Sequence, residues 1–219
     1  MPRRLAKRLR ILITAGPTRE YLDSVRFISN PSSGKMGYAI AAAARAAGHN
    51  VTLVSGPVAL APPAGVRIIH VESTAEMAAA AKKAFAKSDA AIFTAAVCDY
   101  RPRKRARRKL PKRGGGLALD LVPTIDIART LGRRKGRRIT VAFALEDHAA
   151  RRHAESKLRR KNCDAIVLNS PATIGTKKAR VEFLVLRRQW QIWPAAPKKT
   201  VGRRLIREVE KMAAYSLLP

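Results

Sequence analysis

The chain has 219 residues, of which 47% are hydrophobic and 27% are charged, and it carries a formal net charge of +30. This length suits one α/β domain, expected over residues 1–219, that buries its own core without disulfide or metal support. Its two distant cysteines and four scattered histidines form no C-x-x-C or similar spacing, which argues against a zinc site and a disulfide framework. A reducing cytoplasm is the expected setting.

No apolar run approaches the length of a membrane span, and the run that follows the basic N-terminus is too short for a signal peptide. The positive charge favours polyanionic partners such as a nucleotide, a nucleic acid or an anionic membrane. Because the basic residues are spread along the chain with few aromatic residues among them, we expect most of this charge to be solvated surface.

Apolar runs and helical stretches alternate through most of the sequence. Strands are predicted at residues 10–15, 50–54, 67–70, 90–94, 140–143 and 165–168. Helices are predicted at residues 35–47, 74–86, 124–131 and 149–161, and the second of these begins with the capping residues Ser73 and Glu76. The alternation predicts an α/β fold with a Rossmann-like, doubly wound, mostly parallel sheet and helices on both faces. Ligands of such folds bind beyond the carboxyl ends of the strands.

Two segments depart from this alternation. Residues 100–116 contain two prolines and three consecutive glycines, and nine of the thirteen residues from Arg101 to Arg113 are basic, which predicts a mobile basic flap. Farther along, the apolar stretches 181–186 and 189–193 predict a C-terminal β-hairpin, and residues 198–214 predict a terminal helix.

The segment 29–37 lies directly before the first helix and is rich in small polar residues and glycine. It presents backbone N–H groups, the positive end of the helix and Lys35 to an anion. A Walker A loop is excluded, because Ser29 and Met36 occupy the positions of its first glycine and its Ser or Thr, and no G-x-G-x-x-G is present. An anion site and a well-capped surface helix are equally good interpretations of this segment alone.

A second informative loop follows the strand at 90–94. The small residues Ala95 and Ala96 allow a ligand to approach the backbone, and Asp99 can meet a cation or a ribose hydroxyl. An isolated aspartate after a strand is also often a helix cap or a turn former. Lys157 and Lys161 lie on one helix face at i,i+4, and each lysine taken alone is consistent with solvated surface.

Four ordered motifs recur in one known family: ITAGPTRE at 13–20, VRFISN followed by SSGKMG within 25–37, AAV with DYR at 95–101, and KNCD through Asn169. Together they resemble the phosphopantothenoylcysteine synthetases, the phosphopantothenate–cysteine ligases of coenzyme A biosynthesis. The resemblance runs over about residues 10–214. At the flap, Lys109-Leu110-Pro111-Lys112 has one lysine fewer than the Lys-x-Lys-Lys of the family.

The resemblance implies a stand-alone, bacterial-type ligase that acts in two steps. The carboxylate of 4′-phosphopantothenate attacks the α-phosphate of CTP, or of ATP, and the amine of L-cysteine then attacks the acyl-cytidylate. It further implies Mg²⁺ or Mn²⁺, no flavin, and a homodimer with active sites at the subunit junction. Because the chain begins at the first strand of the synthetase, we expect the flavin-dependent decarboxylase of the next step to be a separate protein. Neither a membrane nor a nucleic acid is an expected partner.

The resemblance also assigns roles by position. Asn30 is implied as a catalytic donor to the oxyanion that forms when cysteine attacks, and Lys109 as the catalytic flap lysine that engages the triphosphate. Asp99 is implied as a nucleotide ligand and is the candidate metal ligand. The expected phosphate- and substrate-binding residues are Arg26, Ser32, Ser33, Gly34 and Lys35. The other expected nucleotide-binding residues are Ala95, Ala96, Ile125, Asp126, Ile127, Ala128, Phe143, Lys157 and Lys161.

Two alternatives stay open. A basic nucleic-acid-binding α/β module would use the positive charge directly, and its affinity would fall steeply with salt. A related fold without ligase activity is the other. A nicotinamide-dependent reductase is disfavoured, because the glycine fingerprint of the dinucleotide fold is missing.

Overall fold

The computed structural model describes residues 8–112 and 114–215 of the chain. An eight-stranded sheet in the order β12-β11-β10-β9-β6-β1-β4-β5 forms its centre. From β5 to β10 neighbouring strands are parallel, whereas β11 and β12 add antiparallel strands at one edge. The strands of the sheet are β1 (Arg10–Ala15), β4 (Asn50–Ser55), β5 (Arg67–His70), β6 (Ala90–Phe93), β9 (Ile139–Leu145), β10 (Ala165–Asn169), β11 (Lys178–Val185) and β12 (Gln191–Pro197).

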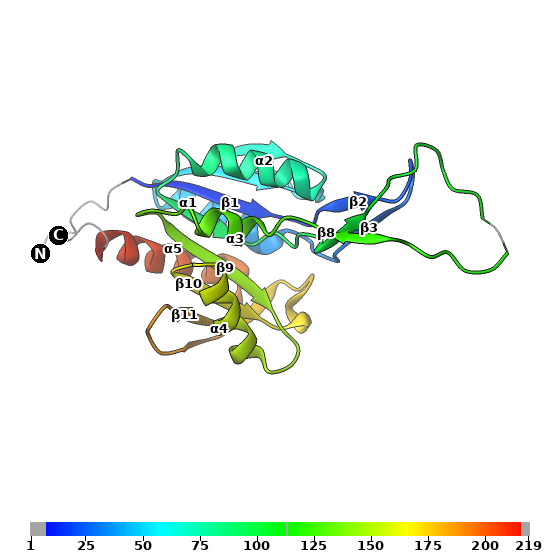
Figure 1. Ribbon diagram of the computed structural model, residues 1–219. Helices are drawn as coiled ribbons and strands as arrows, with labels where there is room; N and C mark the ends of the chain where they lie inside the picture. The colour runs from blue at the N-terminus through cyan, green and yellow to red at the C-terminus, as the bar shows by residue number, and fades with distance from the viewer. Residues whose placement is uncertain (1–7, 113, 216–219) are drawn as a thin grey trace, which may run out of the picture.

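Helices cover both faces of this sheet, as the alternation predicts (Figure 1). The helices are α1 (Lys35–Ala46), α2 (Thr74–Phe85), α3 (Ile127–Gly132), α4 (Ala150–Arg160) and α5 (Lys198–Tyr215), with a 3-10 turn at Pro171–Thr173. Counted along the sheet, the parallel strands have the Rossmann order, and the order reverses between β1 and β6. The predicted α/β doubly wound fold is thereby confirmed, and the predicted hairpin is β11 with β12.

The core follows the alternation of side chains along each strand. Ile11 and Ile13 of β1 point to the face covered by α1 and α5, while Leu12 points to the face covered by α2 and α3. All three side chains are almost fully buried, and each such burial stabilises the fold by about 1.5–3 kcal/mol. The parallel strands are therefore apolar on both faces, which is why they are recognisable as continuous apolar runs.

Two boundaries differ from the predicted ones for local reasons. The helix predicted from residue 124 begins only at Ile127, because the side chain of Asp126 accepts the N–H of Arg129 at 3.0 Å and caps α3. The chain before this cap is extended and forms β8 (Leu121–Pro123). By contrast, the predicted capping residues of α2 do form a capping box between Ser73 and Glu76.

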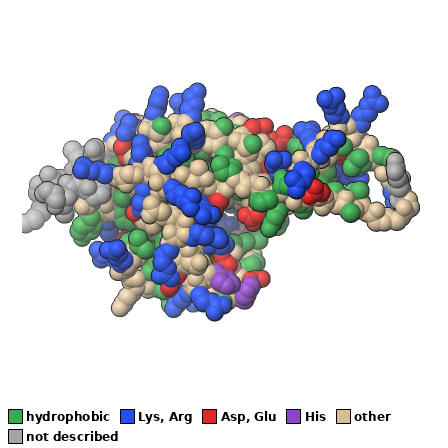
Figure 2. Space-filling model, viewed as in Figure 1, with side chains coloured by type: hydrophobic (Ala, Val, Ile, Leu, Met, Phe, Trp, Pro, Cys, Tyr) green, Lys and Arg blue, Asp and Glu red, His purple; other side chains and the backbone are tan. Residues whose placement is uncertain are grey.

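A long arm, defined here as residues 103–120, projects from the body between β7 (Tyr100–Pro102) and β8 (Figure 1). At its base β7 and β8 pair with each other, next to a second small hairpin of β2 (Arg19–Tyr21) and β3 (Phe27–Ser29). The predicted flap at 100–116 thus begins as a strand, and its connection continues to residue 120. Figure 2 shows Lys and Arg side chains both along this arm and over the visible face of the body.

The first half of the arm is tied to the turn between β2 and β3. Asp23, which is fully buried, accepts the backbone N–H of Leu110 at 3.1 Å, and Arg26 donates to the carbonyl of Leu110 at 2.8 Å. Asp23 also accepts the backbone N–H groups of Val25 and Arg26. Hydrogen bonds from the backbone of Arg26 and from these other donors hold the pKa of Asp23 well below its ordinary value.

Tight packing fixes where α1 begins. A Cβ at Gly37 would lie 2.5 Å from Cβ of Ala15 and 2.5 Å from Oγ1 of Thr94, so only glycine allows this approach to β1 and to the end of β6. No helix in the described part of the chain is both long enough and apolar enough to cross a membrane.

We expect Gly37→Ala to lower the free energy of unfolding by about 1–3 kcal/mol, because overpacking displaces α1. A glycine-to-alanine change in a helix ordinarily stabilises by up to about 1 kcal/mol, so the expected sign is reversed here. Chemical denaturation measures the change. Gly114→Ala is the control, since its Cβ would meet nothing within 4 Å. Unchanged or increased stability of Gly37→Ala would contradict this packing.

We expect Asp23→Asn to release the first half of the arm and to lower the thermal unfolding midpoint near neutral pH. Because the folded-state pKa of Asp23 is lowered, its stabilisation is present above its unfolded value of about 4 and is lost as the pH falls below it. The difference between wild type and variant should therefore shrink on acidification. Hydrogen exchange of residues 104–110 should rise in the variant.

The control for this experiment is Asp120→Asn, which removes an exposed carboxylate paired with Arg103 and should change little. A gap between wild type and Asp23→Asn that stays constant down to about pH 3 would contradict the buried-carboxylate anchor.

Candidate functional site

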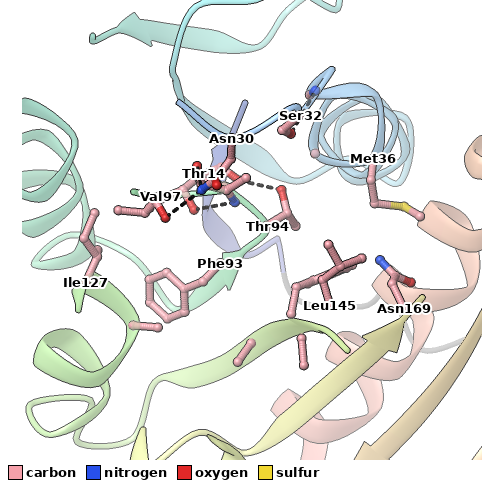
Figure 3. A pocket seen from close by; sticks show the side chains of 18 of the residues that line it. Thr14, Asn30, Ser32, Met36, Phe93, Thr94, Val97, Ile127, Leu145 and Asn169 are labelled. Carbon is pink, nitrogen blue, oxygen red and sulfur yellow. Dashed lines mark hydrogen bonds between the residues drawn. The ribbon is translucent and has the colours of Figure 1, made fainter. Parts of the chain in front are cut away.

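A cavity of about 440 Å³ opens beyond the carboxyl ends of β1, β6 and β9, next to the point where the strand order reverses (Figure 3). This is the place where open α/β sheets bind their ligands. The N-terminus of α1 forms one wall, and the segments after β6 and around the start of α3 form others. Residues of β9, α4, the end of β10 and the first residue of α5 complete the lining.

The N-terminus of α1 is open to the cavity. Gly34 takes a left-handed conformation with φ 70° as its N-cap residue, no side chain caps the helix, and its first turn has no acidic residue. The interpretation of this segment as a well-capped surface helix is therefore not met. Ser32, Ser33 and Lys35 line the cavity beside it, so backbone N–H groups and the positive helix end face an enclosed space.

Asn30 lies across the cavity wall from the loop after β6. Its Nδ2 donates to the carbonyl oxygens of Ala96 and Val97, at 3.2 and 3.1 Å (Figure 3). Both amide hydrogens therefore have acceptors, and its Oδ1 has no hydrogen bond within the described residues. In this arrangement Asn30 offers the cavity an acceptor rather than the donor that the sequence comparison implied.

Asp99 also lines the cavity, and its side chain is exposed. The turn that carries it is fixed by Thr124, whose backbone N–H bonds the carbonyl of Asp99 at 2.8 Å and whose hydroxyl donates to the carbonyl of Cys98 at 2.5 Å. In the described part of the chain no three His, Cys, Asp or Glu side chains come together as a metal cage. A metal ion here would have one carboxylate and would depend on ligand oxygens for the rest.

Two lysines of the cavity are paired with carboxylates. Lys161 donates to both oxygens of Asp126 at 2.8 and 2.9 Å, and Lys157 lies 2.6 Å from Glu146. Partial burial alone would raise the pKa of Asp126, but the Lys161 ammonium and the N–H of Arg129 outweigh it, and the net pKa shift is downward. These pairs fix the start of α3 against α4.

Neither cysteine is poised as a nucleophile. Cys98 is 3% exposed, its thiol faces the carbonyl of Thr18 at 3.4 Å, and burial raises its pKa. Burial raises the pKa of Cys163 to about 11. Both thiols are therefore protonated and shielded near neutral pH, which argues against covalent catalysis by either.

The cavity brings together most of the residues singled out from the sequence. Those that line it are Asn30, Ser32, Ser33, Gly34, Lys35, Ala95, Ala96, Asp99, Ile125, Asp126, Ile127, Ala128, Phe143, Lys157 and Lys161. Two expected residues do not line it. Arg26 is bound to Asp23 and Leu110 at the base of the arm, and Lys109 lies on the arm itself.

Several lining residues were not singled out as site residues from the sequence. Lys198, the first residue of α5, is only 9% exposed and donates to the carbonyl of Thr173 at 3.1 Å. The buried Oδ1 of Asn169 has no hydrogen-bond partner within the described residues, and the segment from Thr173 to Gly175 closes the same end. Asn169 belongs to a family motif that could have indicated it, whereas nothing in the sequence distinguishes Lys198 among 45 basic residues.

Comparison with known proteins gives the same picture of the chain. A family model described as the DNA/pantothenate metabolism flavoprotein C-terminal domain matches residues 6–212. The crystal structure of the C-terminal domain of coenzyme A biosynthesis bifunctional protein CoaBC is similar, with a TM-score of 0.82 and 40% identity over 94% of this chain and 96% of that chain.

Two curated relatives are longer proteins. A cysteine/cysteine sulfinic acid decarboxylase of an unknown prokaryotic organism is 49% identical over 163 residues, which cover 74% of this chain and 45% of that protein. The coenzyme A biosynthesis bifunctional protein CoaBC of Bacillus subtilis (strain 168) is 46% identical over 166 residues, covering 75% of this chain and 41% of that protein. The matched part is thus less than half the length of either relative.

Proposed function

The chain belongs to the DNA/pantothenate metabolism flavoprotein C-terminal domain family, and from this premise we propose that it is a ligase of coenzyme A biosynthesis. It joins 4′-phosphopantothenate to L-cysteine at the expense of CTP. The observation that carries the proposal is the single cavity at the strand-order reversal, which unites Asn30, Asp99 and the open N-terminus of α1. These groups suit an anionic acid and a nucleotide in one space.

The proposed reaction has two steps. A carboxylate oxygen of 4′-phosphopantothenate attacks the α-phosphorus of CTP, and the bond to the β-phosphate oxygen breaks, so pyrophosphate leaves. The amine nitrogen of cysteine then attacks the acyl carbon of the acyl-cytidylate, CMP leaves and the amine loses a proton. The mixed anhydride is needed because a free carboxylate is a poor electrophile.

The first step joins two anions, so the site must lower their repulsion. The N-terminus of α1 and Lys35 supply positive potential from this chain. Mg²⁺, or Mn²⁺, fits this site as an ion shared with substrate, because Mg²⁺ commonly binds one or two carboxylates together with phosphate oxygens. Asp99 would hold it, and the bound ion would neutralise phosphate charge.

Asn30 is proposed to act in the second step. Because its two N–H groups are held by the carbonyls of Ala96 and Val97, its Oδ1 is oriented by the backbone of the loop after β6. An amide oxygen held in this way can accept a hydrogen bond from the attacking amine of cysteine and orient its lone pair. This role replaces donation to the oxyanion as the proposed function of Asn30.

The proposed assembly is a homodimer. Around the base of the arm and along its second half, large apolar side chains are exposed, which is the pattern of a surface that another chain covers. These side chains are Val25, Phe27, Tyr100, Leu117, Leu119 and Leu121. Lys109 lies on an arm that extends away from the body, so we propose that it engages the triphosphate in the cavity of the second copy. The flavin-dependent decarboxylation of the product is proposed to need a different domain or protein.

We expect the purified chain to release pyrophosphate when it is given CTP, Mg²⁺, 4′-phosphopantothenate and cysteine, and to form the amide product. Omission of 4′-phosphopantothenate should abolish pyrophosphate release, because the carboxylate is the nucleophile. Mass spectrometry of the product and a coupled pyrophosphate assay check both points. Absence of pyrophosphate release with CTP, and equally with ATP, would refute the ligase.

We expect Asn30→Asp to form the acyl-cytidylate at a near-normal rate but to pass it to cysteine at least tenfold more slowly, which corresponds to about 1.4 kcal/mol. An aspartate cannot donate to the two carbonyls that hold Asn30, so its side chain loses its orientation. Rapid-quench kinetics separate pyrophosphate release from CMP release. Ser24→Ala, on the exposed turn between β2 and β3, is the control. An equal loss in both steps would contradict this role.

A further inference from the structure

Four lysines line the cavity, and they fall into two classes. Lys157 and Lys161 are paired with Glu146 and Asp126. Lys35 and Lys198 form no ion pair with any carboxylate in the described residues. Each instead donates to a backbone carbonyl of the same short segment, Lys35 to Gly175 at 2.8 Å and Lys198 to Thr173 at 3.1 Å.

The unpaired lysines are close enough to repel each other. Desolvation lowers the pKa of Lys198, and the positive charge of Lys35 lowers it further. A buried ammonium next to a second cation is unfavourable unless an anion compensates for both. Carbonyl oxygens reduce this cost but carry only partial charges. The end of the cavity between α1, α5 and the Thr173–Gly175 segment is therefore a place of uncompensated positive charge.

The donors at this end are also suited to more than one oxygen atom. An ammonium has three N–H donors, and each of these two lysines uses one on its carbonyl. The first turn of α1, which has no side-chain cap and no acidic residue, adds backbone N–H groups beside Lys35. Ligands with several charged oxygens around one centre, such as phosphate groups, match this arrangement.

We propose that Lys35, Lys198 and the first turn of α1 form a phosphate subsite at the Thr173–Gly175 end of the cavity. The proposal rests on the proposed function only for the identity of the phosphate. Under that function both the triphosphate of CTP and the phosphate ester of 4′-phosphopantothenate are possible sources, and the pyrophosphate product has the same chemistry. Lys157 and Lys161 have a different role at this cavity, because their carboxylate partners already balance their charge.

The test compares Lys198→Met with Lys199→Met by calorimetric titration of inorganic pyrophosphate at fixed ionic strength. Lys199 is the next residue of α5 and is exposed, so it loses the same charge outside the cavity. We expect Lys198→Met to weaken pyrophosphate binding at least tenfold, whereas Lys199→Met stays within about twofold of wild type, the difference expected when one charged hydrogen bond is lost. Lys35→Gln is the second variant and should weaken binding in the same direction.

Thermal unfolding separates a binding role from a structural one. Because Lys198→Met removes a buried charge that Lys35 repels, its midpoint without ligand should equal or exceed that of wild type, while its stabilisation by pyrophosphate is smaller. Wild-type and Lys198→Met proteins with equal pyrophosphate affinity would overturn the subsite. So would a wild-type protein that does not bind pyrophosphate, or a Lys199→Met variant that loses as much affinity as Lys198→Met.

Two further measurements identify the phosphate source and separate this proposal from the ligase. A rise in KM for CTP alone in Lys198→Met assigns the subsite to the triphosphate, and a rise for 4′-phosphopantothenate alone assigns it to the phosphate ester. Both outcomes support the subsite. If the wild type has no ligase activity but binds pyrophosphate through Lys198, the ligase is refuted and the phosphate subsite stands.

Discussion

The site depends on one close contact, the approach of α1 to the ends of β1 and β6. Gly37 permits it, since any Cβ at that position would meet Ala15 and Thr94. Gly34, with φ 70°, turns the chain into the helix without a side-chain cap. The first turn of α1 is therefore aimed at the reversal of strand order, and its dipole brings about half a positive charge there. The backbone alone thus creates an anion-binding potential before any lysine is counted.

Carboxylates, rather than cations, decide what the basic residues of this chain can do. With 45 basic and 15 acidic side chains, most cations cannot have a carboxylate partner. Those that do are held in structural roles: Asp23 binds Arg26 at the arm, and Asp126 binds Lys161 between α3 and α4. A paired ammonium presents little net charge to a ligand. The few acids consequently divide the cations of the cavity into positioning groups and groups available to an anion.

The sequence predicts those parts of the fold that local patterns determine. Strands buried on both faces are continuous apolar runs, so β1, β4, β6, β9 and β10 could be located, and their alternation with helices predicted the parallel sheet. The arm hairpins could not be located, because β2, β3, β7 and β8 have three residues each and show no usable periodicity. Lys198 was missed for another reason. Its burial arises from the packing of α5 on α1 and from a segment some 25 residues earlier, and neither is a local property.

The anchoring of the arm bears on how Lys109 can reach a nucleotide. Leu110, its neighbour, is held through both its N–H and its carbonyl by Asp23 and Arg26. Freeing the arm would remove donors from a fully buried carboxylate, and an unpaired buried charge is costly. A swing of Lys109 into the cavity of its own chain is therefore disfavoured relative to delivery by an arm that stays anchored. The anchored arm points away from the body, where a second copy would meet it (Figure 1). On this argument the homodimer and the function of the flap lysine are one prediction, because the same hydrogen bonds that fix the arm make a partner necessary.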